Sequence, residues 1–159
     1  MSNENSSIFK NFFQTLNIIF IALLSGQSIY FFVGIFLIQS GNIDGFGEFN
    51  TIFMFITPVV VLSSILASKF IYSKQVAEFD KSLSLENKLV SYRTANIIKL
   101  ALLEGANIFN ISIMIITANY FFAALFIIII ALFFFNRPTK EKFIMDFEVS
   151  ADDALKLLV

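Results

Sequence analysis

The dominant pattern along the chain is a series of four long apolar runs separated by shorter polar segments. These runs are Phe12–Ile38, Ile52–Tyr72, Thr94–Thr117 and Ala118–Phe135. A helix needs about 20 predominantly apolar residues to cross the hydrocarbon core of a bilayer. The pattern therefore predicts four transmembrane helices. The first run is too long for a signal peptide and lacks a small-residue cleavage site, so we expect it to stay in the mature chain.

Composition agrees with a membrane protein and leaves little room for a separate soluble domain. Of the 159 residues, 57% are apolar and 14% are charged, whereas soluble domains carry about 25% charged residues. We therefore predict one compact, all-α integral membrane domain whose first partner is the lipid bilayer. A net charge of −1 gives no basic footprint for nucleic acid, so we expect no nucleic-acid partner.

The basic residues predict the orientation of the chain in the membrane. The Gln39–Asn50 loop and the Thr117–Tyr120 turn carry no Lys or Arg. Every basic residue except Lys99 lies in the N-terminus, in the Lys69–Arg93 connection or in the C-terminal tail. Because Lys and Arg concentrate in cytoplasmic segments, we place both termini and the connection in the cytoplasm. The expected location is the bacterial cytoplasmic (inner) membrane.

The first and third runs resemble each other. Thr15–Tyr30 and Thr94–Phe109 share nine identities in sixteen positions at an offset of 79 residues. The segments Asp80–Leu89 and Asp146–Leu155 repeat in the same way at an offset of 66. The chain is therefore predicted to be two tandem units, 1–89 and 90–159, each a transmembrane hairpin with a cytoplasmic tail. An even number of spans per unit makes the two repeats parallel.

Both cytoplasmic tails are expected to include a short helix that starts at a serine. Ser84 is followed by Glu86, and Ser150 is followed by Asp153 in a capping-box pattern. Before Ser150, apolar and polar residues alternate from Met145, which predicts a short extended segment. The second tail is too apolar to be free in solution, so it either lies on the membrane surface or docks on a partner.

The third run carries a stripe of polar residues. At 100° per residue these side chains fall within a sector of about 80°, so they should face the bundle interior or another subunit. The sector contains Asn96, Lys99, Asn107, Asn110 and Thr117, and Glu104 extends its edge. Lys99 is near enough to the cytoplasmic end to extend outward to the interface.

Glu104 is the most informative residue of this stripe. It lies about 15 Å into the third run at 1.5 Å per residue, where an ionisable group is costly and indicates a functional site. At this depth the acid is either protonated and hydrogen-bonded, for example to Asn107, or paired with a cation such as Lys99. Two interpretations remain open: a neutral acid that joins helices, or a carrier of a proton or cation.

Other residues indicate structure rather than chemistry. Pro58 in the second run removes one backbone hydrogen bond and predicts a helix kink near Thr57. The chain has no Cys and no His, which excludes thiol nucleophiles and the usual zinc sites. No catalytic sequence motif occurs. We therefore expect no enzymatic activity, no catalytic residue, no metal and no cofactor.

The segment Ala101-Leu-Leu-Glu-Gly105, followed by Ile-Phe and an Ile-rich run, resembles the ion-carrying helix of the membrane-rotor proteolipids (c or K subunits) of rotary ATPases. The segment Leu24–Ile38 is similar to the acid-free helix of duplicated members of that family. The resemblance covers the first and third runs. It implies that Glu104 binds a proton or a sodium ion in an oligomeric ring.

Two main functional hypotheses follow. In the first, the protein is a non-catalytic four-helix integral membrane subunit of a larger inner-membrane assembly, with other membrane-protein subunits or its own copies as partners. In the alternative, it is a proton- or cation-translocating, proteolipid-like oligomer that uses Glu104. A third possibility is a module that binds lipid or a small apolar ligand around the asparagine stripe, for which no motif is found.

Overall fold

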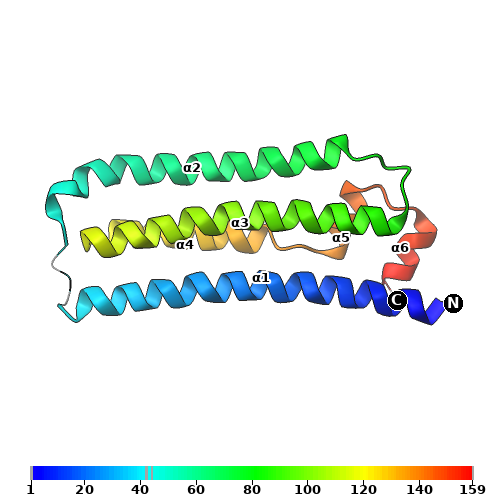
Figure 1. The fold of residues 1–159 in the computed structure, drawn as a ribbon, viewed down its shortest axis with the longest axis horizontal. Helices are drawn as coiled ribbons and strands as arrows, with labels where there is room; N and C mark the ends of the chain where they lie inside the picture. Colours follow the sequence, from blue (N-terminus) through cyan, green and yellow to red (C-terminus); the bar gives the residue numbers. More distant parts are fainter. Residues whose placement is uncertain (1, 42, 44, 159) are drawn as a thin grey trace.

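The computed structural model describes residues 2–41, 43 and 45–158, with side chains for residues 11–41, 43 and 45–155. The outermost positions of the two predicted units, 1 and 159, lie outside this range. The described chain is helical and contains no strand, which confirms the all-α class. Its six helices are α1 (Ser2–Gln39), α2 (Gly47–Glu78), α3 (Leu85–Thr117), α4 (Phe121–Phe135), α5 (Lys140–Asp146) and α6 (Ala151–Leu158) (Figure 1).

Three of the helices, α1, α2 and α3, are long and apolar enough to cross a membrane. The fourth predicted span is shorter than the sequence indicated. Helix α4 has 15 residues, or about 22 Å at 1.5 Å per residue, against a hydrocarbon core of about 30 Å. It qualifies as a span only together with α5, from which it is bent by 69°. The described chain thus has three helices that are long and apolar enough to span a membrane, or four if this bent pair is one span.

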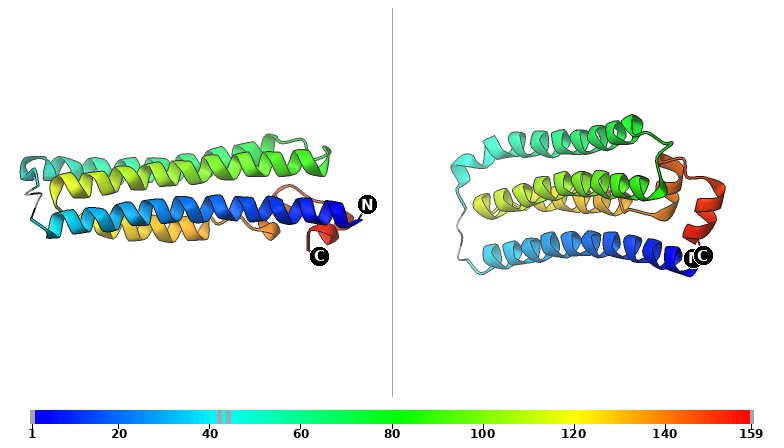
Figure 2. Two further views of the ribbon diagram at one scale, coloured as in Figure 1. Left: turned by 60° about the horizontal axis from the view of Figure 1, so that its bottom comes forward. Right: turned by 45° about the vertical axis from the view of Figure 1, so that its right-hand side comes forward.

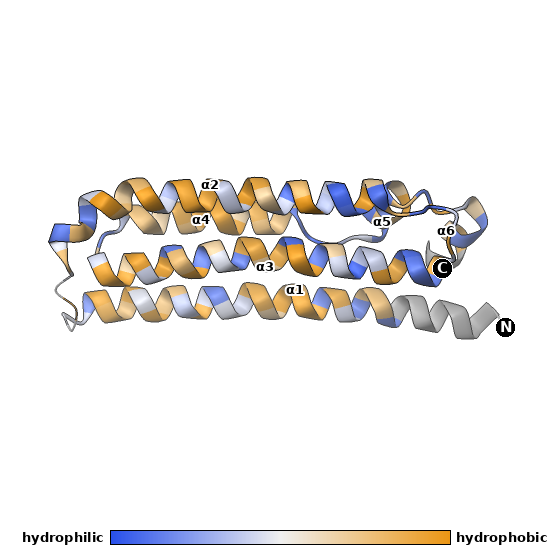
Figure 3. Cartoon of the chain, turned by 45° about the horizontal axis from the view of Figure 1, so that its top comes forward, coloured by the Kyte–Doolittle hydropathy of each residue, from blue (hydrophilic) through white to orange (hydrophobic). Residues whose placement is uncertain are grey.

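The outward surfaces of the long helices are those expected next to lipid. Phe55 and Phe70 of α2 and Phe135 of α4 are 73%, 68% and 78% exposed. Figure 3 shows that hydrophobic residues dominate α1 to α4 and that hydrophilic residues interrupt α3. Aromatic rings so exposed would be unfavourable in water, whereas in a bilayer they face hydrocarbon.

Helix α3 is the central element of the bundle. Half of its most apolar 18-residue stretch is buried, compared with 17% in α1 and in α2. It lies between α1 and α2, and α4 packs against it (Figures 1 and 2). Helices α1 and α3 run in the same direction, and both chain ends lie at one end of the bundle. That end is called the inner end below, after the predicted orientation; the repeat and the orientation remain predictions.

The connection from α4 to α5 is not helical, yet its backbone groups are bonded. The Tyr92 hydroxyl donates to the Thr139 carbonyl at 2.9 Å and accepts from the Thr139 N–H at 3.1 Å. Lys142 Nζ donates to the Phe135 carbonyl at 2.8 Å. Non-helical backbone near membrane depth is tolerated only where protein or water satisfies it. Tyr92 and Lys142 supply these bonds at the break.

The C-terminal tail folds back on its own bundle. The expected contact of this tail with the membrane surface or with a partner stays a prediction. Phe143 and Phe147 are fully buried in a cluster with Leu16, Leu89 and Tyr92. The tail is also tied down by polar contacts: Glu148 pairs with Lys81. The inner ends of α1 and α3 offer an apolar surface that the tail rings cover, so neither a membrane surface nor another protein is needed to bury them.

Helix boundaries around the tail partly match the predictions. Helix α3 starts after Ser84, whose Oγ accepts from the Asn87 N–H at 3.4 Å. Helix α6 starts after Ser150, which accepts from the Asp153 N–H at 3.3 Å, as the capping pattern predicted. The prediction of an extended segment from Met145 was wrong, because Met145 and Asp146 belong to α5. Burial of Phe143 and Phe147 four residues apart favours one helical face over alternation.

Pro58 lies inside α2, which continues as one helix from Gly47 to Glu78. The predicted kink at this residue stays a prediction. Thr57, just before it, is fully buried.

Candidate functional site

The polar stripe of α3 divides into an interior part and an exposed edge. The buried side chains are those of Asn96, Lys99, Asn107, Asn110 and Thr117. Glu104 is only partly buried, and the adjacent Gly105 is exposed. The stripe therefore does not form one site. It forms a central amide layer, an acidic face toward the outside of the bundle, and a lysine-containing region at the inner end.

The central layer connects α3 to two other helices. Asn107 Nδ2 donates to Gln27 Oε1 of α1 at 2.6 Å, and both side chains are buried. Asn110 Nδ2 donates to the Phe122 carbonyl of α4 at 2.9 Å. Interhelical bonds of this kind join transmembrane helices. The layer fixes the positions of α1 and α4 along α3.

The same layer retains unused hydrogen-bonding capacity. Asn107 Oδ1, Asn110 Oδ1, Gln27 Nε2 and Thr57 Oγ1 are buried without a partner among the described residues. Thr57 precedes by one turn Val61, which packs with Ala106 of α3. Because α2 runs antiparallel to α3, Thr57 lies near the level of Asn110. Four unpaired polar atoms from three helices thus occupy one level of an otherwise apolar interior.

Glu104 lies on a different side of α3. It makes no hydrogen bond or salt bridge with any described residue, and Asn107 and Lys99, the partners suggested by the sequence, contact Gln27 and Tyr72 instead. Ala101 and Gly105 beside it are exposed, and Ile108 is 41% exposed. A Cβ added at Gly105 would meet nothing within 4 Å. We call Ala101, Glu104, Gly105 and Ile108 the Glu104 face.

The spacing of small residues on the Glu104 face is that of helix-contact motifs. Ala101 and Gly105 are four residues apart, which places two small side chains on one line of α3. Small residues at this spacing let the backbones of two transmembrane helices approach closely. No helix of the described chain covers this line. The arrangement combines a close-approach surface with one unpaired carboxyl group.

At the inner end, Lys99 is 5% exposed, and its Nζ lies 4.0 Å from the centroid of the Tyr72 ring. The Tyr72 hydroxyl donates to Asp146 Oδ2 of α5 at 2.6 Å. Asn96, one turn before Lys99, donates to the Tyr92 carbonyl of its own helix at 2.8 Å. A hollow of about 310 Å³ opens beside Lys99. The Tyr72 ring contacts the Lys99 ammonium group and stabilises it in this buried position.

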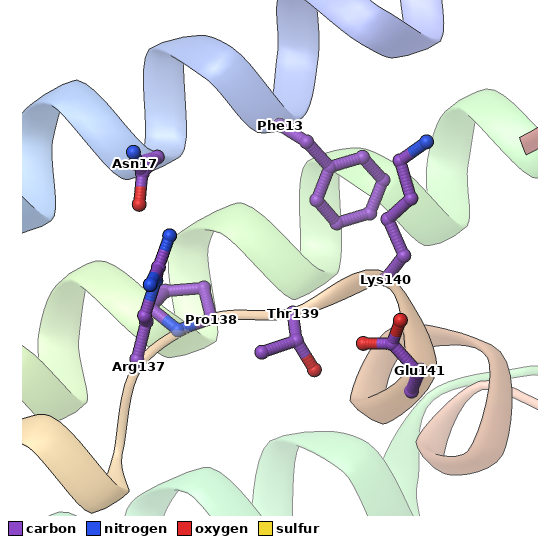
Figure 4. Close-up of a pocket in the computed structure, with 7 residues that line it drawn as sticks. All are labelled: Phe13, Asn17, Arg137, Pro138, Thr139, Lys140 and Glu141. Atoms are coloured by element: carbon purple, nitrogen blue, oxygen red, sulfur yellow. The ribbon is translucent and has the colours of Figure 1, made fainter. Parts of the chain in front are cut away.

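A second hollow, of about 250 Å³, lies between α1 and the α4–α5 connection. Figure 4 shows Asn17 of α1 and Arg137 of the connection pointing toward one another across it. Asn17 Oδ1 is buried without a hydrogen-bond partner among the described residues. Lys140 and Glu141 complete the hollow on its inner side. Arg137 and Lys140 outnumber Glu141, so the lining of this hollow carries a net positive charge.

The described residues do not form a metal site or an acid–base pair around the polar stripe. Within the residues that the structure describes, no three His, Cys, Asp or Glu side chains come together as a metal-binding group. The acidic residue at depth, Glu104, has no second titratable group bonded to it. The geometry can join helices, offer a carboxyl group to a partner, or hold an ion from outside the bundle.

Several residues important to this geometry were not assigned a contact from the sequence. Gln27, Tyr72, Tyr92 and Asp146 each bond to another element. Gln27 had a usable signal, because it is an amide in the middle of a 27-residue apolar run. Tyr72 and Tyr92 had none, since tyrosines are common at the ends of transmembrane helices.

Comparison of the chain with protein-family models, with curated protein sequences and with solved structures finds no match. The functional argument therefore depends on the geometry of the chain itself.

Proposed function

We propose that the protein is a non-catalytic integral membrane subunit of a larger inner-membrane assembly, and that it binds its neighbour through the Glu104 face. The observation that carries this proposal is the unpaired, partly exposed Glu104 beside the small residues Ala101 and Gly105. The long apolar helices and their exposed aromatic surface support the membrane location.

Energetics favours a covered Glu104 face. Glu104 is about 20 Å from the outer end of α3 at 1.5 Å per residue, well inside the hydrocarbon. An acidic residue facing lipid at this depth costs about 2.5–3.5 kcal/mol on insertion scales. A neighbouring helix that supplies a cation or an amide donor removes much of this cost. The small residues at 101 and 105 allow such a helix to come close enough.

The partner that fits best is a transmembrane helix of a different subunit. In a two-fold contact between copies of this chain, Glu104 would meet the same residue of its partner. Two acidic groups at one site cannot both ionise comfortably. A helix with a basic or amide side chain at this depth avoids that conflict.

The decisive experiment compares assemblies from native membranes in mild detergent. Ala101→Leu places a bulky side chain on the Glu104 face and should block the close approach of a neighbouring helix. Ala131→Leu makes the same change at an exposed position of α4. We expect the first variant to lose its co-purifying partner and the second to keep it, with both chains folded. A wild-type chain that runs as a lone monodisperse species, or equal behaviour of the two variants, would contradict the proposal.

The alternative function is proton or cation translocation by an oligomer in which Glu104 is protonated and released in turn. Its support is the position of this acid at membrane depth without an internal partner, together with the resemblance to rotor proteolipids. Glu104→Gln separates the two functions. A subunit whose partner offers an amide to this face should assemble normally with the near-isosteric amide, and one whose partner offers a basic residue should lose that partner. A translocator should assemble and lose ion flux in reconstituted vesicles.

A further inference from the structure

The hollow beside Lys99 brings together basic residues from three parts of the chain. Helices α2, α3 and α5 contribute to it, together with the first residue after α4. Its volume is about 310 Å³. The lining residues, which we call the lysine pocket, are Lys69, Tyr72, Ser73, Lys99, Asn136, Lys142 and Asp146.

The charges of the lysine pocket do not balance. Three lysines face it with a single acid, Asp146, whose Oδ2 already accepts the Tyr72 hydroxyl. Lys99 is 95% buried and makes no salt bridge with any described residue. A buried cation without a counter-ion costs several kcal/mol. The pocket therefore offers positive charge that an external anion would neutralise.

Depth in the membrane narrows the class of anion. Lys99 is 18 residues from the outer end of α3, which is about 27 Å at 1.5 Å per residue. The hydrocarbon core is about 30 Å thick, so the lysine pocket opens near its inner boundary. Phosphate groups of the inner leaflet lie at this level. The break after Phe135 opens the bundle here, because α4 ends before it reaches the boundary.

We propose that the lysine pocket binds a phosphate group, carried by an anionic lipid headgroup or by a small soluble phosphate. Lys69 of α2 and Lys99 of α3 supply the charge. The hydroxyl of Ser73 and the second N–H of the Asn136 amide, whose Nδ2 already donates to the Leu132 carbonyl, supply neutral donors. Lys142 is partly engaged with the Phe135 carbonyl, so it contributes charge more than a free donor. The carboxyl group of Asp146 repels anions, so it limits the negative charge that the pocket can accept.

The test uses the full chain purified in a neutral detergent and measures its thermal unfolding. One arm adds phosphatidylglycerol or phosphatidylcholine as mixed micelles, and the other adds inorganic phosphate against chloride at equal ionic strength. Stabilisation by phosphatidylglycerol alone identifies the headgroup as the source, and stabilisation by inorganic phosphate identifies a soluble ligand. The absence of both effects overturns the proposal.

Matched variants distinguish phosphate binding in the lysine pocket from a general attraction of anions to the basic surface. Lys69→Gln removes an exposed lysine of the pocket, and Lys74→Gln removes an exposed lysine of the same helix outside it. We expect Lys69→Gln to weaken binding about fivefold, the effect of one basic residue near a membrane surface, and Lys74→Gln to leave it unchanged. Lys99→Met should abolish binding; if that variant fails to fold, the comparison of the two surface variants decides. Equal weakening by both surface variants would refute the pocket.

Discussion

At the residue scale, the hydrogen bond between Gln27 and Asn107 joins α1 to α3 in the bundle interior. Its donor and acceptor are 2.6 Å apart, and both side chains are buried at 1% exposure or less. In an apolar interior neither amide has water as an alternative partner. The pair therefore works as a unit, and the loss of one member leaves the other unsatisfied.

A double-mutant cycle tests this unit. Asn107→Leu and Gln27→Leu should each destabilise the chain by about 1–2 kcal/mol, because each leaves a buried amide unpaired. The double variant should lose less than the sum, since two apolar side chains then face each other. Ser28→Ala is the control, because Ser28 bonds only to a carbonyl of its own helix. The measurement is reversible unfolding in mixed micelles. Additive losses would show that the two amides do not depend on each other.

At this scale the sequence predicted which side of α3 is polar and could not predict how that side is divided. The 3.6-residue period fixes the angle of each residue around one helix, and Asn96, Asn107 and Asn110 are buried as that angle indicates. Glu104 lies at the edge of the sector, where a few degrees of helix rotation decide between interior and outside. That rotation depends on the side chains of α1 and α2, which the pattern of α3 does not contain.

At the scale of elements, the C-terminal tail is held by rings rather than by backbone pairing. Phe147 is fully buried and lies 5.1 Å from Phe79 and 5.9 Å from Tyr92, as ring centroids. Phe→Ala at a buried site costs about 3–5 kcal/mol. We expect Phe147→Ala to release α5 and α6 while leaving α1 to α3 in place.

Limited proteolysis and hydrogen exchange measure this release. Met145→Ala is the matched control, because Met145 lies two residues before Phe147, at the end of α5, and is 76% exposed. The expected result is faster cleavage and exchange between residues 140 and 158 in Phe147→Ala alone. Equal protection in both variants would mean that the rings do not hold the tail.

The sequence predicted most element types and missed the two places where elements bend. The apolar run that ends at Phe135 is followed by Pro138, which favours the end of a helix. The 69° bend into α5, however, depends on the hydrogen bond from the Tyr92 hydroxyl to the Thr139 carbonyl, 47 residues further along the chain. Period-two alternation predicts an extended segment from Met145. The same alternation over a few residues also occurs in short helices, so the pattern could not distinguish the two. Long-range contacts decided both cases.

At the scale of the whole molecule, the absence of cysteine from the chain makes the transmembrane topology directly measurable. Single substitutions at exposed positions, Gly47→Cys, Lys74→Cys and Leu155→Cys, mark the outer end of α2, its inner part and the tail. With an impermeant maleimide we expect labelling at position 47 in intact cells, and labelling at positions 74 and 155 only after permeabilisation. Labelling of 74 and 155 from opposite sides would show that α4 and α5 do not cross.

The central claim is that another transmembrane helix covers the Glu104 face in the native membrane, and a photoreactive side chain placed there tests it most directly. Ile108 lies on this face and is 41% exposed, whereas Ile127 belongs to α4, outside this face, and is 65% exposed. After illumination of native membranes, the account predicts a discrete protein adduct from position 108 and lipid adducts alone from position 127. Lipid adducts alone from both positions would contradict it.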